Sequence, residues 1–433
     1  MNSGSFCPTF KIEFAQLSDL GMRRMNNQDS LAVVATNDRE TWANRGHLLM
    51  VADGMGAHAA GELASKLAVD NIPHAYFKLR DLYPPAALRR AIRDANALIH
   101  GKGQSTIGFL GMGTTCSCLL LLPQGALVAH VGDSRVYRLR GHRLSQLTFD
   151  HSLVWEMAAA GQMAEEDVPA YIPKNVITRS LGPHETVNID LEGPYDAAEN
   201  DVFLLCSDGL SGQIPDAELG ALLHCLTPEE AVQSLVDVAN LRGGPDNISV
   251  VVARVIGEGA PPTKTVAEAP PRKVPSAPAT SLFQAIGAAS LVALVGCLVA
   301  QIWIGAAVAA AGLALSILQL ATARHGRSPE SSSRYEIGGP YGNGPYRDTP
   351  CEPDRNVVNR LVEIVDRLRQ LTVGEGPQID WSPLEKHASE GQAAAERGDF
   401  RSAIRGYTAA IRAVMRQLRA HRRTIDDSGE YLA

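Results

Sequence analysis

The 433-residue sequence has few cysteines and no Cys-x-x-Cys pair. Its seven cysteines are odd in number and scattered, so neither a disulfide framework nor a structural zinc site is predicted. Basic residues are not in excess either. The 40 Lys and Arg against 47 Asp and Glu give a net charge of −7, which argues against nucleic-acid binding. The N-terminal residues lack an apolar core of signal-peptide length, so secretion through a cleaved signal is not expected.

One stretch lacks charge altogether, because no Asp, Glu, Lys or Arg occurs between Lys273 and Arg324. Residues 282–323 are almost wholly apolar, and as one helix they would be about 63 Å long, twice the hydrocarbon core of a bilayer. We therefore predict two membrane-spanning helices in a hairpin, with basic flanks on the cytoplasmic side. The alternative is one long, tilted span, which would place the C-terminal region across the membrane. Either reading predicts a cell-membrane protein in contact with lipid; the hairpin makes it multi-pass.

The remaining sequence divides by composition into folded and linker regions. The region 1–256 mixes short apolar runs with helical patterns, whereas the flanks of the apolar stretch are rich in Pro, Gly and Ser. The predicted organisation is a folded domain at 1–256, a Pro/Ala-rich linker at 257–281, a membrane region at 282–323, a disordered linker at 324–353 and a helical region at 354–425.

The secondary structure expected in 1–256 is mixed. Strands are predicted at 47–52, 115–122, 202–206 and 248–255, and helices at 59–81, 85–100 and 228–241. Only short turns separate 115–122, 125–131 and 135–140, so these strands are expected to pair antiparallel. The predicted class is an α+β sandwich.

Several apolar runs end in Asp followed by Gly or Ser, at Asp53, Asp133 and Asp208, and Asp246 opens another run. Carboxylates at strand ends can meet at one edge of a sheet, and an oxygen-only cluster suits Mg²⁺ or Mn²⁺ better than Zn²⁺. A single Asp-Gly is more often a β-turn. Four such sites together favour metal binding.

These motifs and their order resemble the metal-dependent Ser/Thr protein phosphatases of type 2C, in their bacterial form. The resemblance covers roughly residues 10–255 and implies a four-layer αββα fold, two antiparallel sheets flanked by helices. It is carried by Ser18-Asp19-Leu20-Gly21, Arg24, Asn26-Asn27, Asp29, Val51-Ala52-Asp53-Gly54-Met55-Gly56, Gly61-Glu62, Gly113-Thr114-Thr115, Val131-Gly132-Asp133-Ser134-Arg135, Asp150-His151-Ser152, Ile177-Thr178-Arg179, Ser207-Asp208-Gly209 and Gly244-Pro245-Asp246-Asn247.

The resemblance also implies a site that holds two Mn²⁺ or Mg²⁺ ions, and a third, weaker ion. Asp53 would bridge two ions, and the carbonyl of Gly54 would bind one of them. Asp208 and Asp246 would complete the other ion. The remaining implied ligands are Asp29, acting through water, and Asp133, at the third ion.

Arg24 would bind the substrate phosphate, because a guanidinium fork matches phosphate oxygens. The expected catalytic residues are Arg24, Asp53 and Asp208. The implied reaction is hydrolysis of phosphoserine and phosphothreonine in proteins by a metal-bridged water, counteracting Ser/Thr kinases at the membrane. The alternative is a catalytically weak scaffold that senses phosphoproteins through the C-terminal helices.

Some residues near these motifs are given no catalytic role. Cys206 lies in an apolar run and is interpreted as core. His58 stays unassigned, and His130 and His151 are expected to be packed or solvated. Gln28 stands where many relatives have Glu. The stretch 152–175 matches the position of the bacterial flap beside the site, although an ordinary surface loop would also fit.

The C-terminal region is predicted to be helical. Apolar residues recur at helical spacing within 354–371, and the stretch 384–418 resembles one tetratricopeptide repeat, although a plain helical hairpin fits equally well. The excess of basic residues around 384–423 would suit anionic headgroups or an acidic protein partner.

Overall fold

The computed structural model describes residues 11–56, 59–161, 176–257, 340–370 and 379–428, and every structural statement below concerns these residues. The chain divides into two compact units. One unit combines residues 1–262 with residues 337–433, and the other, 263–336, falls within the part that is not described.

The first sheet has six strands, each antiparallel to its neighbours. In spatial order they are β1 (Lys11–Asp19), β11 (Ile248–Ile256), β10 (Val202–Cys206), β7 (Arg135–Arg140), β8 (Arg143–Gln146) and β12 (Arg347–Pro350). The strand at one edge, β12, comes from far beyond the others in the sequence.

The second sheet is also antiparallel and consists of β2 (Asp29–Val34), β3 (His47–Met55), β5 (Cys116–Leu122), β6 (Gly125–Val131) and β9 (Asp190–Tyr195), with β4 (Gly113–Thr114) paired to β3. Successive side chains of a strand point to opposite faces. On β3, Leu49 and Val51 face a core between the sheets that also contains Phe203, whereas Leu48 and Met50 face the helices. Both faces are apolar because both are covered.

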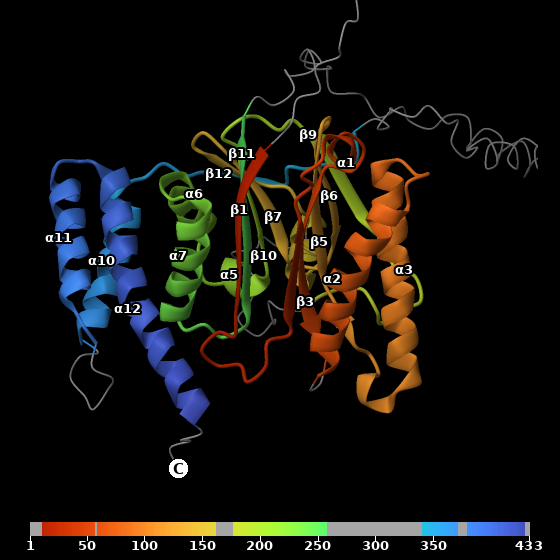
Figure 1. Cartoon of the computed structure of the whole chain (residues 1–433), viewed down its shortest axis with the longest axis horizontal. Coiled ribbons are helices and arrows are strands. Elements are labelled where there is room, and N and C mark those ends of the chain that lie inside the picture. Colours follow the sequence, from red (N-terminus) through yellow and green to blue (C-terminus); the bar gives the residue numbers. More distant parts are fainter. Residues whose placement is uncertain (1–10, 57–58, 162–175, 258–339, 371–378, 429–433) are drawn as a thin grey trace, which may run out of the picture. The chain divides into compact units, whose positions relative to one another are not determined.

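Helices cover the outer faces of both sheets (Figure 1). The helices α2 (Ala60–Lys78) and α3 (Pro84–Ser105) pack on the second sheet, and α6 (Asp216–Cys225) and α7 (Pro228–Leu241) pack on the first. Short helices occur at α1 (Arg39–Arg45), η1 (Ile107–Phe109), α4 (Leu153–Ala159) and α5 (Asp208–Ser211). Two antiparallel sheets with helices are thus confirmed.

The expected pairing of three consecutive strands is only partly right. The strands β5 and β6 pair, but β7 does not pair with β6 and joins β10 and β8 in the other sheet. The connection contains Gly132 at φ 114°, a conformation that favours glycine, and it carries the chain from one sheet to the other. A short turn between two strands therefore does not guarantee a hairpin.

Three further helices follow β12: α10 (Arg355–Gln370), α11 (Ser382–Glu396) and α12 (Phe400–Ser428). As predicted, α10 buries an apolar face. The helices α11 and α12 cross closely, since a Cβ atom on Gly406 would lie 2.7 Å from the Cα atom of Gly391. This is a helical hairpin. Its likeness to a tetratricopeptide repeat stays a prediction.

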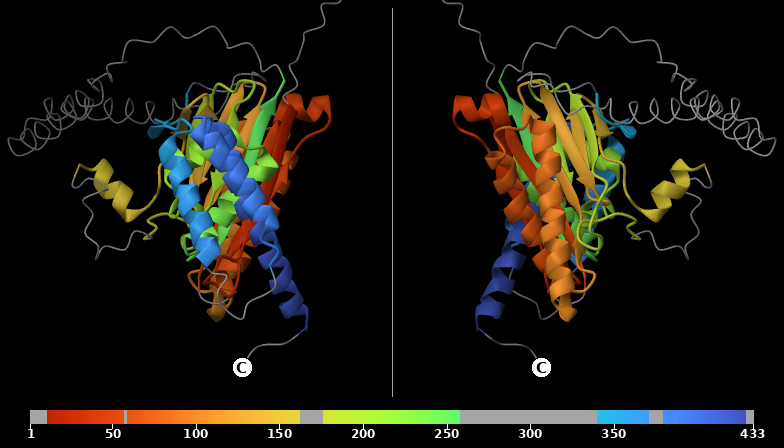
Figure 2. Two further views of the ribbon diagram at one scale, coloured as in Figure 1. Left: turned by 90° about the vertical axis from the view of Figure 1, so that its left-hand side faces the viewer. Right: turned by 90° about the vertical axis from the view of Figure 1, so that its right-hand side faces the viewer.

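The C-terminal helices pack on the catalytic body as a further layer. The helix α12 lies against α6 and α7 (Figure 2). Its apolar residues belong to the same buried cluster as theirs. Arg405 Nε donates to the carbonyl of Cys225 at 2.7 Å, and Arg412 Nη1 donates to Ser234 Oγ at 2.7 Å. Cys351, just after β12, packs against Gly220 of α6.

Two sequence expectations need correction. From residue 340 onward, the predicted disordered linker 324–353 is structured and forms β12. The linker at 257–281 and the hairpin at 282–323 lie outside the described residues, apart from Gly257. Within the described ranges no helix combines the length and apolar character needed to cross a bilayer.

This finding contradicts the prediction of a multi-pass membrane protein with a cytoplasmic catalytic domain, which is wrong. The prediction used the apolar length of 282–323 and its basic flanks, whereas the long described helices carry charged residues along their length. The expected contact with membrane lipid rested on this prediction and loses its support.

Candidate active site

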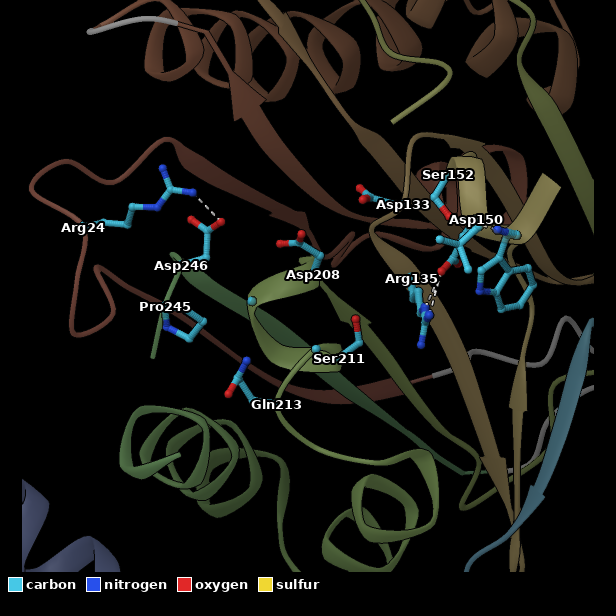
Figure 3. A pocket seen from close by; sticks show the side chains of 14 residues that line it. Arg24, Asp133, Arg135, Asp150, Ser152, Asp208, Ser211, Gln213, Pro245 and Asp246 are labelled. Carbon is cyan, nitrogen blue, oxygen red and sulfur yellow. Dashed lines mark hydrogen bonds and ion pairs between the residues drawn. The ribbon is translucent and has the colours of Figure 1, made fainter. Parts of the chain in front are cut away.

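A cleft of about 630 Å³ opens at one end of the sandwich. Arg24 and Asp246 lie at one end of it, Asp208 and Asp133 lie further along, and Arg135 and Asp150 lie at the other end (Figure 3). The other lining residues are Ser152, Val154, Trp155, Gly209, Ser211, Gly212, Gln213 and Pro245.

The predicted carboxylates come from separate strands; Asp133, Asp208 and Asp246 line the cleft, whereas Asp29 and Asp53 lie outside its lining. Asp53, near the end of β3, is paired in register with Asp29 at the start of β2. Asp208 begins α5 directly after β10, and Asp246 precedes β11 in the same sheet. Asp133 lies in the connection between β6 and β7. Since the two sheets pack face to face, their strand ends bring these residues together.

Neutral side chains hold the carboxylates in place. Ser207 Oγ donates to Asp29 Oδ2 at 2.8 Å, and the backbone N–H of Asp53 donates to Thr115 Oγ1 at 2.8 Å. Asn247 Nδ2 donates to two carbonyls of the loop 20–26, and its Oδ1 accepts the backbone N–H of Gln28 at 2.8 Å. Asn247 therefore ties the loop of Arg24 to the segment that carries Asp246.

Burial and mutual repulsion make these carboxylates hard to ionise. Burial, followed by repulsion from neighbours including Asp208, raises the pKa of Asp133 to about 8. Burial raises the pKa of Asp29 to about 7, against the hydrogen bond from Ser207, and raises the pKa of Asp53 and Asp208 above the usual range. Such a cluster is stabilised by compensating positive charge.

The residues fit divalent cations by the chemistry of their donors. The Oδ1 atoms of Asp29, Asp133 and Asp208 are buried without a hydrogen-bond partner, and a buried polar atom without a partner is costly. In the described part of the chain, no three His, Cys, Asp or Glu side chains lie close enough together to hold a metal ion by themselves. The fit therefore rests on oxygen-only donors with unmet bonding capacity, which suits Mg²⁺ or Mn²⁺.

Gly54 follows Asp53 where the backbone is closely confined. A Cβ atom there would lie 2.1 Å from the carbonyl oxygen of Gly61 and 2.6 Å from that of Gln28. Only glycine fits this contact. The Gln28 side chain donates to the carbonyl of Gly56 at 3.3 Å, so the amide that replaces the expected Glu supports the loop after Asp53.

Arg24 lies in the cleft, and its partner there is a carboxylate. Its Nη2 atom is 2.6 Å from Asp246 Oδ2, and 49% of the side chain is exposed. An arginine that is half exposed beside the carboxylate cluster can turn its remaining N–H groups toward a bound anion.

The far end of the cleft contains residues that sequence reasoning did not select. Arg135 Nη2 is 2.7 Å from Asp150 Oδ2, and the Arg135 guanidinium carbon is 5.6 Å from the ring centre of Trp155. Arg135 and Asp150 belong to recognised motifs, which could have marked them. Trp155, in α4, falls within the stretch 152–175 predicted to be the flap, but no signal singled out this residue.

The remaining candidates lie outside the cleft lining. Cys206 is buried in β10, and burial raises the pKa of its thiol to about 12, which agrees with a core role. His151 is buried, with Nδ1 accepting the N–H of Gly132 and Nε2 donating to Asp190. Burial lowers the pKa of His130 to about 3, so this ring is neutral. His58 and most of the predicted flap, residues 162–175, lie outside the described residues.

Comparison with known proteins agrees with this arrangement. The protein phosphatase 2C family profile matches residues 22–240. Protein phosphatase PhpP of Streptococcus pneumoniae is 34% identical over 258 residues, 58% of this chain and 100% of the relative. Serine/threonine phosphatase stp of Listeria monocytogenes is 35% identical over 241 residues, 54% of this chain and 92% of the relative.

Solved structures give the same result. The serine/threonine phosphatase PstP/Ppp of Mycobacterium tuberculosis superposes with a TM-score of 0.50 at 34% identity, covering 57% of this chain and 99% of the other. The S. agalactiae serine/threonine phosphatase has a TM-score of 0.50 at 33% identity, covering 57% and 100%.

The chain belongs to the protein phosphatase 2C family. It is a protein-serine/threonine phosphatase of the bacterial type, with a C-terminal extension that begins well beyond the residues matched by the family profile.

Proposed function

We propose that the cleft hydrolyses phosphoserine and phosphothreonine in proteins with the help of Mn²⁺ or Mg²⁺. The observation that supports this most directly is the group of buried aspartates whose oxygens lack partners, next to a half-exposed arginine. The aspartates and the arginine suit different parts of the reaction, because carboxylates bind hard cations and a guanidinium binds phosphate oxygens.

The residues that would hold two ions are Asp53, Asp208, Asp246 and Gly54 through its carbonyl, with Asp29 acting through water. By the family resemblance, Asp133 would serve a third, weaker ion; it lies close enough to Asp208 for the two charges to repel. When bound, such ions lower the pKa of a coordinated water and neutralise charge on the phosphoryl oxygens.

The protein itself supplies position and charge. Arg24 would hold the phosphate group, and its bond to Asp246 fixes the guanidinium beside the carboxylates before substrate arrives. The proposed catalytic residues are thus Arg24, Asp53 and Asp208. The physiological counterpart would be a Ser/Thr protein kinase that adds the phosphate groups.

The test is turnover by the purified full chain. A phosphothreonine peptide is assayed after chelation, and again after Mn²⁺ or Mg²⁺ is restored. We expect phosphate release only with the metal. Phosphate release that persists fully in chelator would contradict the metal assignment. Tight peptide binding without turnover at any metal concentration would favour the scaffold reading.

A further inference from the structure

Residues 341–351 return to the catalytic body and contact the edges of both sheets. Tyr341 exchanges backbone hydrogen bonds with Gly193 of β9, at 2.6 and 3.1 Å. A few residues later, β12 pairs with β8 in the other sheet, with Arg347 opposite Gln146. One segment therefore contacts an edge of each of the two sheets.

Buried polar contacts anchor this segment. Glu192 of β9 is 2% exposed, and its carboxylate accepts a hydrogen bond from Tyr346 Oη at 2.5 Å and another from the backbone N–H of Gly344 at 3.0 Å. A buried carboxylate needs such donors. The segment is thus part of the fold of the catalytic body and not a strand laid loosely on its surface.

The same segment reaches the far end of the cleft. The guanidinium carbon of Arg347 is 4.9 Å from the ring centre of Trp155, within cation–π range. Its Nη1 atom is 3.8 Å from Asp216 Oδ2. The ring of Phe149 meets Trp155 edge-on at 5.4 Å and Tyr346 at 5.5 Å. Both residues of the Tyr346–Arg347 pair therefore support Trp155, one directly and one through Phe149.

We propose that Arg347 is a positioning residue for the substrate cleft: it holds Trp155 against the far end of the cleft, where the peptide around the phosphorylated residue would bind. This inference rests on the proposed function. It assigns the C-terminal extension a part in peptide recognition, and none in the chemistry at the carboxylates.

Position along the cleft determines the expected effect. Arg24 and Asp246 lie at the other end from Arg135, the neighbour of Trp155 (Figure 3). A small aryl phosphate occupies only the carboxylate end, whereas a phosphopeptide extends along the cleft. Loosening Trp155 should therefore weaken peptide binding, a KM effect, more than turnover of the small substrate.

The test compares Arg347→Ala, Trp155→Phe and the double variant, in the full chain with Mn²⁺. A phosphothreonine peptide and p-nitrophenyl phosphate are the two substrates. Arg347→Ala should raise the peptide KM about five-fold, the effect of losing one cation–π contact. Phenylalanine is a weaker cation–π partner than tryptophan, so both changes act on the same contact, and the double variant should fall short of the product of the two single effects.

Two further variants separate positioning from stability. Arg347→Lys keeps a cation beside the indole without the planar guanidinium and should recover part of the peptide KM. The control is Arg143→Ala, which removes an exposed partner of Asp348 at 3.4 Å from the same strand pair and should leave the peptide KM unchanged. An unchanged KM in Arg347→Ala, or effects of the two single changes that multiply in the double variant, would overturn the proposal.

Failure of the proposed function would be visible separately, as absence of Mn²⁺-stimulated turnover of both substrates by the unaltered protein. Tryptophan emission still tests the inference in that case. The quantity measured is the change in emission when the phosphopeptide is added. Arg347→Ala should alter this change in the protein that has Trp155, and should not alter it in the Trp155→Phe variant. An identical response in both backgrounds would overturn the role of Arg347.

Discussion

The two ends of the cleft differ in chemistry and in the part of the sequence that supplies them. At one end, aspartates from residues 29–246 repel one another and leave buried oxygens without partners. At the other end, Arg135 is matched by Asp150, and Trp155 is supported by Arg347, a residue about a hundred positions beyond the family profile. The first end has unmet bonding capacity that the proposed cations would fill, whereas the charged groups at the second are paired within the chain. Changes at the two ends should therefore have different kinetic signatures.

The largest effect is expected at the carboxylate end. Asp208→Asn removes one charge from the proposed ligand set, and turnover with Mn²⁺ should fall by roughly two orders of magnitude or more. The fold should persist, because the change also removes repulsion between buried carboxylates. Phosphate release against Mn²⁺ concentration measures the effect. Asp70→Asn, an exposed carboxylate on α2, is the control, and wild-type turnover of the Asp208 variant in saturating Mn²⁺ would refute the assignment.

The next largest effect is expected where the C-terminal helices meet the catalytic body, and it is a loss of folding stability and not of turnover. Arg419 of α12 pairs with Asp237 of α7, whose side chain is fully buried. Arg419→Ala leaves that carboxylate without its cation and should lower the free energy of unfolding by about 3 kcal/mol. Denaturant unfolding measures this, with the exposed Arg416→Ala as control. Equal stability of the two variants would show that α12 contributes nothing through this pair.

Arg24 is proposed to bind the substrate phosphate and not a metal ion, so its loss should affect substrate binding more than turnover. Arg24→Ala should raise the KM for a phosphopeptide roughly ten-fold, the effect of losing a charge-assisted contact to phosphate, while kcat changes less. The neighbouring, exposed Arg23→Ala is the matched control. Steady-state kinetics distinguish the two, and a KM unchanged by the loss of Arg24 would remove this residue from the phosphate site.

The sequence predicts the carboxylate end far better than the other. An apolar run precedes each of Asp53, Asp133 and Asp208, and this local pattern can be recognised without knowledge of the fold. Nothing local indicates that residue 347 pairs with β8, because the energy of strand pairing comes from a partner two hundred positions away. For the same reason the change of sheet between β6 and β7 cannot be predicted from a short turn, and the contact between Trp155 and Arg347 cannot be predicted from either local sequence.

The smallest change in the free energy of unfolding at neutral pH is expected from Asp237→Asn. This variant tests the pairing of Asp237 with α12 through the pH dependence of stability. Burial raises the pKa of Asp237 to about 6, although the hydrogen bond and charge of Arg419 oppose this and the nearby Asp19 reinforces it. The folded protein then binds more protons than the unfolded chain between about pH 4 and 6. The stability contributed by Asp237 is therefore fully present below pH 4 and is lost as the pH rises through 6.

Asparagine cannot titrate, so the variant should lack this part of the decline. Unfolding free energies of the metal-loaded wild type and variant, measured across pH 4–7, give the difference directly and cancel the titration of groups common to both proteins. We expect the variant to gain relative stability as the pH rises through 6. A difference that stays constant across this range would mean that Arg419 keeps Asp237 ionised throughout, and the ion pair would then outweigh burial at this junction between the C-terminal helices and the catalytic body.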